Sequence, residues 1–331
     1  MFKSKITGLG FYVPENIVSN DDLSKLMETS DDWISERTGI KNRRWVGDKK
    51  LTTSLMGTYA AEKAIAAAGI DKNDIDFIIF STLSPDYYFP GSGVLLQRNL
   101  GIKEIGALDV RNQCSGFIYG LSIADQYIKS GMYKNILLVG SEIHSGGLDK
   151  STKGRSVSVI FGDGAGAAVI SSTKSESGIL STHLHSEGKY AEELAVIKPA
   201  TTHWIDKMKS DQNDESYWPY MNGNFVFKNA VVRFEQVIKE GLEYSNLNIE
   251  DISLLIPHQA NLRISQFIQK KLKLSDSQVF NNIMKYGNTT AASIPIALTE
   301  AYQSNLIKKN DIVVLAAFGS GFTWGSAVIK W

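Results

Sequence analysis

Cysteine is scarce in this sequence of 331 residues, where Cys114 is the only one. A single cysteine excludes an intrachain disulfide, and alone in an intracellular protein it is either an inert buried residue or a nucleophile awaiting a base. Long apolar runs are also missing, since the strand candidate at residues 312–318 is far shorter than the roughly 20 residues that span a bilayer. The N-terminal segment lacks the apolar stretch of a signal peptide. We therefore expect a cytoplasmic protein that does not enter a membrane.

An excess of either charge sign is missing too. Lys and Arg together number 35, and so do Asp and Glu. Without a net basic field, the composition does not favour nucleic acid or an acidic membrane as a partner, although a local basic patch is compatible with it. Hydrophobic residues make up 43% and charged residues 21%, which is typical of a folded globular protein, and the length favours about two domains.

The two halves of the chain show the same order of patterns. A helical pattern that ends at Gly69 precedes an apolar strand at 74–82, and a helical pattern that ends at Asn246 precedes an apolar strand at 251–259. Nearly continuous apolar runs of this kind indicate strands that are buried on both faces, with helices on either side. The order therefore predicts an α/β fold.

The repetition continues downstream of both strands. The segments that start at Cys114 and at Asn288 each read as a helix rich in small residues followed by an apolar strand. We favour a duplicated α/β unit, with an N-terminal half at 1–173 and a C-terminal half at 174–331, over chance similarity of amphipathic helices. If the duplication holds, Cys114 and Asn288 are pseudo-equivalent and meet in one central cleft.

Cys114 follows a predicted strand at 107–110 and precedes a helix. At the N-terminus of a helix, the positive end of the helix dipole lowers the pKa of a thiol and raises the thiolate fraction. The sequence therefore predicts an activated nucleophile at this position. The alternative is a buried cysteine that packs as a small hydrophobic residue.

His258 is the histidine that directly follows a buried strand, at the end of the strand where α/β proteins place their sites. Taken alone, a histidine is more often a satisfied polar residue than a catalyst, and Asn288 in a glycine-containing turn is more often a cap. Together with Cys114 on related loops, however, the two side chains indicate nucleophilic acyl chemistry.

Two glycine-rich segments need separate interpretations. Residues 162–169 lack the Lys-Ser/Thr ending of a phosphate-binding loop and the spacing of a dinucleotide-binding turn, so a tight turn with close strand packing is the better interpretation. Residues 318–325 lie between two predicted strands. A Gly-Ser-Gly turn there can aim a backbone N–H at a reacting oxygen, and a plain hairpin turn is the alternative.

Several of these segments, taken in order, resemble the β-ketoacyl-acyl carrier protein synthase III family of thiolase-like condensing enzymes. They are DVRNQCSGFIYGL, VIFGDGAGAAVI, GILSTHLHSEGKY, LLIPHQANLRI, YGNTTAASIP and AAFGSGFTWGSAVIKW, and the opening TSDDWISERTGIKNRRW fits the same family. The resemblance covers essentially the whole chain. It implies a thiolase-like five-layered αβαβα fold built from two pseudo-symmetric halves, usually as a homodimer.

The resemblance also implies roles for the central residues. Cys114 matches the acylated nucleophile, and His258 and Asn288 match the pair that hydrogen-bonds the extender thioester. The backbone N–H groups of Cys114 and Ser320 match the oxyanion hole, and Phe318 matches the residue beside the departing carboxylate. The implied activity is a decarboxylative Claisen condensation, in which an acyl-CoA primer and malonyl-ACP or malonyl-CoA give a β-ketoacyl thioester. No metal or redox cofactor is expected.

Further positions follow from the same resemblance. CoA-binding positions are Trp33, Arg37, Arg155, Asn224, Phe227 and Asn261. The basic side chains Lys228 and Arg263 match contacts to an acidic carrier protein, and Phe89 matches the residue that reaches into the acyl pocket of the partner subunit. Without the resemblance, Trp33 and the arginines would be interpreted as half-buried surface.

The chain departs from the ordinary family pattern in several places. Asn112 and Gln113 precede the nucleophile where small residues are usual, and Ser115 follows it. Segments 84–90 and 198–223 also differ, and a lid over the tunnel is one hypothesis for the second. These features look closer to relatives that make quinolone or alkylresorcinol products from unusual acyl or aroyl thioesters, so a specialised ketosynthase is an alternative function.

Rival classes are disfavoured by single residues. A degradative thiolase needs a second cysteine, and an elongating synthase needs a second histidine where Asn288 stands. A papain-like hydrolase shows neither the duplicated pattern nor CGSCW around its nucleophile. A non-catalytic scaffold of the same fold is the remaining alternative of another class, but it would be expected to lack Cys114.

Overall fold

The computed structural model describes residues 2–48, 50–198, 200 and 214–331 as a mixed α/β structure. The strands are β1 (Lys3–Tyr12), β2 (Ile17–Ser19), β3 (Asn42–Arg44), β4 (Phe77–Ser81), β5 (Gly106–Val110), β6 (Asn135–Glu142), β7 (Gly164–Thr173), β8 (Gly178–Ser186), β9 (Leu194–Ala195), β10 (Tyr220–Met221), β11 (Leu254–Pro257), β12 (Ile312–Gly319) and β13 (Thr323–Lys330). The α-helices are α1 (Asn20–Ser24), α2 (Asp31–Thr38), α3 (Thr53–Ala68), α4 (Ser92–Leu100), α5 (Gly116–Lys129), α6 (Arg155–Ser158), α7 (Gly223–Tyr244), α8 (Leu262–Leu272), α9 (Ile283–Tyr286) and α10 (Ser293–Gln303).

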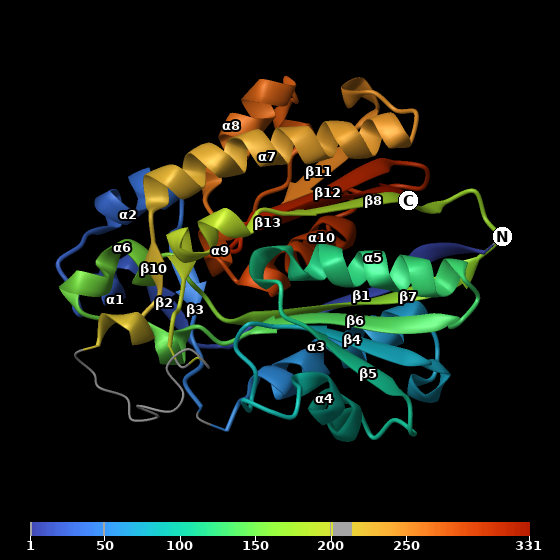
Figure 1. Ribbon diagram of the computed structural model, residues 1–331, viewed down its shortest axis with the longest axis horizontal. Helices are drawn as coiled ribbons and strands as arrows, with labels where there is room; N and C mark the ends of the chain where they lie inside the picture. The colour runs from blue at the N-terminus through green and yellow to red at the C-terminus, as the bar shows by residue number, and fades with distance from the viewer. Residues whose placement is uncertain (1, 49, 199, 201–213) are drawn as a thin grey trace.

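The main elements form five layers, which Figure 1 shows from the bottom of the view to the top. Helices α3 and α4 cover the outer face of the first sheet, and α7 and α8 cover the outer face of the second. Helices α5 and α10 lie between the two sheets and contact both. The structure thus confirms the αβαβα arrangement that the resemblance implied.

The two large sheets repeat one topology. The first has the strand order β1-β7-β6-β4-β5, and the second has the order β8-β13-β12-β11. In both, two antiparallel pairings are followed by a parallel pairing. Where β5 extends the first sheet, a single parallel bridge between Leu255 and Val279 extends the second. The chain passes from one sheet to the other over residues 174–177, and the division of the chain at residue 173 stays a prediction.

The buried strands and the helix ends follow the sequence pattern. Every residue of β4 and of β11 is buried, as predicted for strands covered on both faces. Gly69 ends α3 with a φ of 67°, and Asn246, with a φ of 55°, follows the end of α7. Both residue types tolerate this left-handed conformation, which explains why both predicted helix ends are confirmed.

The glycines of 162–169 serve strand packing. A Cβ on Gly166 would lie 2.7 Å from the Cβ of Pro295, so this position lets β7 approach α10 closely. The interpretation of this segment as a structural turn and strand is confirmed. Within the ranges described above, the chain contains no helix with the length and apolar character needed to span a bilayer.

Candidate active site

One cavity of about 470 Å³ brings the predicted central residues together. Its wall includes Cys114, His258 and Asn288, with Phe318 and Gly319 beside them. Cys114 comes from the turn before α5, and Asn288 from the segment before α10, so both derive from the central layer. His258 directly follows β11. The fold therefore places a thiol, an imidazole and a carboxamide in the wall of one cavity.

The expected equivalence of Cys114 and Asn288 is wrong by three residues. A short 3-10 turn precedes each central helix, Gln113–Ser115 before α5 and Thr290–Ala292 before α10. Each turn begins with a residue of positive φ, 43° and 51° respectively. Aligning the turns pairs Cys114 with Ala291, because the two loops have the same backbone shape where each helix begins. The sequence pattern located the loops but not this register.

Cys114 is 7% exposed and packs against the backbone of the hairpin formed by β12 and β13. A Cβ added to Gly319 would lie 2.6 Å from the Cβ of Cys114 and 3.1 Å from its Sγ. Only glycine allows the backbone of β12 to pass so close to the thiol. The hairpin between β12 and β13 is confirmed, and it brings the Ser320 N–H within hydrogen-bonding reach of the Cys114 sulfur.

The predicted lowering of the Cys114 pKa is wrong. Burial, together with the nearby charge of Glu142, raises the pKa of the thiol to about 12. Hydrogen bonds from the backbone N–H groups of Cys114 and Ser320 favour the thiolate but do not offset burial. The sequence shows the helix N-terminus but not the loss of solvent, and desolvation outweighs the local dipole here.

Glu142 is a buried carboxylate at the end of β6 that sequence reasoning missed. It accepts hydrogen bonds from the Thr82 hydroxyl at 3.0 Å and the Ser84 hydroxyl at 2.7 Å, and from the N–H groups of Leu83 and Ser84. Burial nevertheless raises its pKa to about 7. The carboxylate fixes the loop that follows β4. An acidic residue at the end of an otherwise apolar strand is the sequence signal that marks it.

His258 is buried, and burial lowers the pKa of its imidazole to about 3, so the ring is neutral near pH 7. Its Nδ1 lies 2.5 Å from the Oγ of Ser293. Within the described residues, its Nε2 has no hydrogen-bond partner although it is buried. Because buried polar atoms normally have partners, this nitrogen marks a place for a ligand.

Asn288 is held so that its amide group has one defined orientation. Its Oδ1 accepts a hydrogen bond from the Thr290 N–H at 2.8 Å, and its own N–H donates to the Ile160 carbonyl at 2.9 Å. Its carbonyl accepts from the Gly162 N–H at 3.0 Å. With Oδ1 engaged, the Nδ2 donor is the part of the amide left for a molecule in the cavity.

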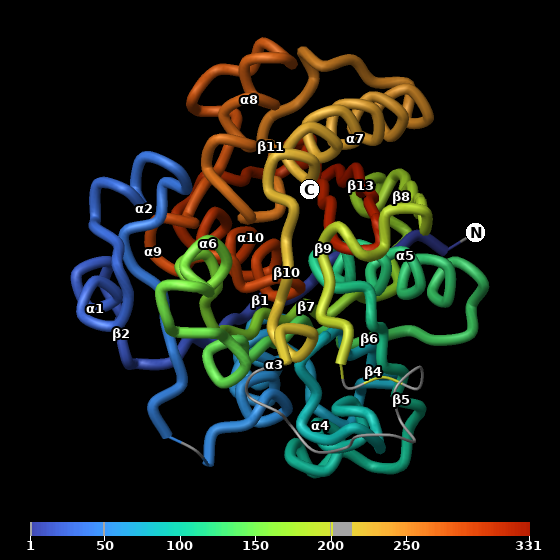
Figure 2. Tube along the Cα trace, turned by 60° about the vertical axis from the view of Figure 1, so that its left-hand side comes forward, coloured from blue at the N-terminus to red at the C-terminus, as the bar shows by residue number. Residues whose placement is uncertain are grey.

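One end of the cavity carries aromatic and cationic groups. Trp33 and Arg37 line this end. The guanidinium carbon of Arg37 lies 4.6 Å from the centroid of the Trp33 ring, and that of Arg155 lies 4.5 Å from it. Arg155 itself is outside the cavity wall. Figure 2 shows α2 and α6, which carry these residues, near each other, and Figure 1 shows both at the left-hand end of the molecule. The exposed Arg37 thus lies at the outer end of the cavity, and the buried Cys114 lies at its inner end.

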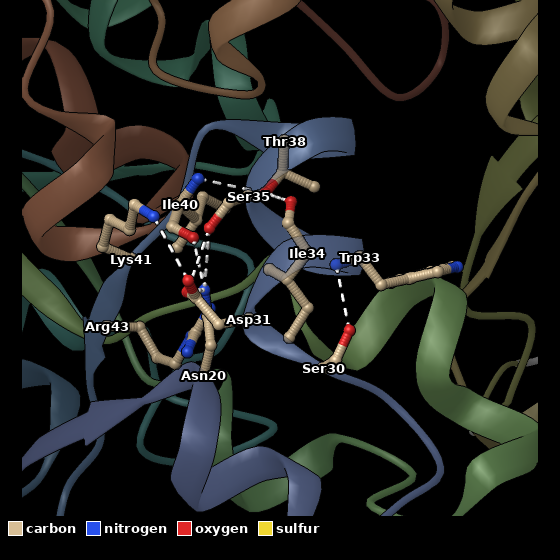
Figure 3. A network of polar contacts seen from close by, with 10 residues as sticks. All are labelled: Asn20, Ser30, Asp31, Trp33, Ile34, Ser35, Thr38, Ile40, Lys41 and Arg43. Atoms are coloured by element: carbon tan, nitrogen blue, oxygen red, sulfur yellow. Dashed lines mark hydrogen bonds and ion pairs between the residues drawn. The ribbon is translucent and has the colours of Figure 1, made fainter.

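A buried polar network fixes α2 in this place (Figure 3). The side chain of Asn20 donates to the Asp31 carboxylate at 2.7 Å and to the Ile40 carbonyl at 2.7 Å, which tethers both ends of α2. Its oxygen accepts from the fully buried Arg43 at 2.7 Å, and Arg43 also donates to the Val159 carbonyl, next to α6, at 3.0 Å. The network therefore connects the two helices that carry Trp33 and Arg155.

The remaining predicted positions divide into two groups. Residues that line the cavity are Asn224, Phe227, Asn261 and Arg263. Asn261 also caps α8 and donates to the Arg37 carbonyl at 3.0 Å. Lys228 lies outside the cavity wall and is exposed, and Phe89 is 81% exposed and lies away from the cavity.

The predicted lid at 198–223 falls mostly on residues 199 and 201–213, which lie outside the described residues. The flanks of this segment are described. Strands β9 and β10 pair with each other, and Leu194 and Met221 from these strands line the cavity. The lid itself stays a prediction.

A buried cysteine that shares a cavity with a histidine and an asparagine, at the centre of a duplicated five-layered fold, defines a thiolase-like condensing enzyme of the acyltransferase type. Two family models match the chain: 3-oxoacyl-[acyl-carrier-protein (ACP)] synthase III over residues 108–188, and the C-terminal model of the same synthase over residues 242–331.

Full-length relatives agree with these models. The β-ketoacyl-[acyl-carrier-protein] synthase III of Aliivibrio fischeri is 45% identical over 327 residues, which cover 99% of each chain. That of Caldanaerobacter subterraneus is 44% identical and covers 98% of this chain and 97% of its own. The crystal structure of 3-oxoacyl-[acyl-carrier-protein] synthase III from Aquifex aeolicus matches with a TM-score of 0.91 at 42% identity, covering 99% of this chain and all of that one. The chain belongs to the β-ketoacyl-acyl carrier protein synthase III family.

Proposed function

We propose that this protein condenses an acyl-CoA primer with malonyl-ACP, with loss of CO₂, to give the β-ketoacyl thioester that initiates fatty acid synthesis. The observation that carries the proposal is the cavity whose wall Cys114 shares with His258 and Asn288. The family membership supports the same reaction. The alternative of a specialised ketosynthase is not favoured, because the full-length relatives named above are β-ketoacyl-[acyl-carrier-protein] synthases III.

Acylation comes first. The sulfur of Cys114 attacks the thioester carbonyl carbon of the primer, the bond to the CoA sulfur breaks, and the thiol proton leaves with CoA. The backbone N–H groups of Cys114 and Ser320 favour negative charge on the cysteine sulfur, and this supports them as the donors to the oxygen of an acyl group bound there. Each such donor is worth about 3 kcal/mol in comparable sites.

Condensation follows in the same cavity. The thioester oxygen of the malonyl group accepts hydrogen bonds from His258 and Asn288, which stabilise the enolate as CO₂ departs. The enolate carbon then attacks the acyl carbonyl, and the Cys114 sulfur leaves. Phe318 is 4% exposed and stands beside the cysteine in the cavity wall, where an apolar surface disfavours the malonyl carboxylate relative to CO₂.

The outer end of the cavity suits the CoA nucleotide. The Trp33 ring offers an apolar face for adenine, and Arg37 and Arg155 offer charge to phosphates. Asn224, Phe227 and Asn261 lie along the path that pantetheine would follow. The exposed cations Lys228 and Arg263 near this end suit an acidic carrier protein.

A homodimer is part of the proposal. Among the described strands, β5 pairs with β4 alone, so its other edge is unpaired at the border of the first sheet. Tyr87, Tyr88 and Phe89, in the loop after β4, are 54%, 67% and 81% exposed. An unpaired strand edge near exposed aromatic side chains supports association of two copies there. Phe89 would then reach toward the acyl pocket of the partner.

Other expectations stay predictions. The cytoplasmic compartment and the absence of a metal or redox cofactor belong to this group, as do the primer and its chain length. The scaffold alternative differs from the enzyme by its lack of a covalent step.

Mass spectrometry of the intact protein tests the proposal. Incubation with a panel of acyl-CoAs should add one acyl mass to the wild type and none to Cys114→Ala, and later addition of malonyl-ACP should remove the acyl group and release CO₂. The absence of an adduct on the wild type, or an equal adduct on Cys114→Ala, would reject the mechanism. The acyl-CoA that reacts fastest identifies the primer class.

A further inference from the structure

Ser293 is a buried hydroxyl whose hydrogen bonds determine how His258 presents itself to the cavity. It is the first residue of α10 and is 2% exposed. Its Oγ has two polar neighbours: the Gln259 N–H at 3.4 Å and the Nδ1 of His258 at 2.5 Å. The Gln259 N–H can only donate, so the serine oxygen acts as the acceptor in that contact.

Within the described part of the chain, the Ser293 hydroxyl then has one acceptor to which it can donate a hydrogen bond. Among the described residues, no other acceptor lies within hydrogen-bonding distance of the Ser293 Oγ, and a buried hydroxyl that fails to donate costs about 1–3 kcal/mol. The serine proton therefore goes to Nδ1 of His258. In a neutral imidazole, an Nδ1 that accepts a hydrogen bond places the ring proton on Nε2.

We propose that Ser293 is a positioning residue, which fixes His258 as the tautomer protonated at Nε2 and directs that N–H into the cavity. The inference rests on the proposed function, since the N–H of His258 serves the extender thioester only if the condensation takes place. This role explains why the buried Nε2 of His258 has no hydrogen-bond partner among the described residues, because its partner would be the carbonyl oxygen of a bound thioester.

The Asn288 amide is held by the same part of the chain. The Thr290 N–H binds its Oδ1 and leaves Nδ2 as the donor, just as the Ser293 hydroxyl binds Nδ1 of His258 and leaves Nε2–H as the donor. Two donors that converge on one oxygen stabilise an enolate, whereas a bare Nε2 lone pair would repel it. The segment from Thr290 to Ser293 thus orients both groups.

Nitrogen-15 NMR of histidine-labelled protein tests the tautomer directly, with the His258 signals assigned by their loss in His258→Asn. The wild type should show a protonated Nε2 and an unprotonated Nδ1. An unprotonated Nε2 in the wild type would overturn the proposal, whatever the activity of any variant.

Kinetics of Ser293→Ala test the consequence. We expect condensation of the preformed acyl enzyme with malonyl-ACP to slow by about 10–100-fold, the range found when a residue that orients a metal-binding histidine is removed, while acylation of Cys114 changes by less than about twofold. Ser293→Thr keeps the hydroxyl and should restore condensation. Thr299→Val is the matched control, because it removes a buried hydroxyl of the same helix that donates to the Pro295 carbonyl and not to His258.

The outcomes separate two failures. Equal condensation rates in Ser293→Ala and the wild type, or an equal loss in Thr299→Val, would overturn the positioning role. If the wild type forms no acyl enzyme, the proposed function fails, while the NMR result still decides the tautomer.

Discussion

Alkylation of Cys114 measures how far burial controls the nucleophile. The thiol is 7% exposed, and burial raises its pKa from the ordinary value of 9.0 to about 12. Because only the thiolate reacts with iodoacetamide, the reactive fraction at pH 8 is about a thousandfold below that of an ordinary cysteine. We expect the rate constant to rise about tenfold with each pH unit from pH 7 to pH 10, without a plateau near pH 9.

The assay uses the single thiol. Wild-type protein is treated with iodoacetamide at each pH, quenched, and weighed as the intact chain, and Cys114→Ala gives the background from other groups. Protein unfolded in urea supplies the reference in which the same thiol is solvated. A plateau of the native rate with a midpoint at or below pH 9 would refute the argument from burial.

Glu142 makes the same reasoning testable by mutation. Its charge is the second cause of the raised thiol pKa, and its own pKa is raised to about 7, so the carboxylate is charged above pH 7 and neutral below it. Glu142→Gln should therefore alkylate faster than the wild type at pH 9, and the difference should vanish near pH 6. Equal rates at pH 9 would show that the charge does not act on Cys114.

Three further predictions concern the site and its supports. In Gly319→Ala the new Cβ would overlap Cys114, so acylation should fall at least about 100-fold, whereas Gly188→Ala, where a Cβ meets nothing within 4 Å, should acylate normally. Asn20→Ala releases α2, and we expect the KM for acyl-CoA to rise about tenfold while the KM for the matching acyl-pantetheine, which lacks the nucleotide, stays unchanged. Burial lowers the pKa of His258 from 6.5 to about 3 in the folded protein. As the pH falls below about 6.5, His258 is therefore protonated in the unfolded chain but not in the folded one, and the free energy of unfolding of the wild type falls. Denaturant unfolding at pH 7 and pH 5 should show about 2 kcal/mol less of this loss in His258→Asn.

The positions of Cys114, His258 and Asn288 were predictable because each follows or precedes an element with a strong periodic pattern. Strand ends in an α/β fold converge, so residues placed there meet without further information. The pKa of Cys114 was not predictable. The helix dipole is a local property that the sequence shows, whereas desolvation depends on Gly319 and on walls that come from distant parts of the chain.

Supporting residues escaped prediction for a related reason. Ser293 and Thr290 are ordinary residues at the start of a helix, and only the tertiary contacts show that they bind His258 and Asn288. Arg43 is fully buried, although charged residues are usually exposed, and no local pattern marks it. For the same reason, the connection from Arg43 to the helix of Trp33 could only come from the structure.

The duplicated fold explains how one site obtains two different halves. In the first half, the end of β4 lies against the first residue of α5. In the second half, the end of β11 lies against the first residue of α10. In the first half these residues are Ser81 and Gly116, where a Cβ on the glycine would lie 2.0 Å from the serine Oγ. In the second half, the same spacing along the chain places His258 against Ser293, which are joined by a hydrogen bond.

The same backbone contact thus serves two purposes. Gly116 leaves no side chain beside Ser81, so the turn that carries Cys114 can approach the sheet and bury the thiol. Ser293 fills the corresponding place with a hydroxyl and turns the strand end into an oriented donor. Ala291 stands where Cys114 would repeat, so the second half supplies polarising groups and no second nucleophile. Differences at these three corresponding positions therefore place the nucleophile in one half of the fold and the oriented imidazole in the other.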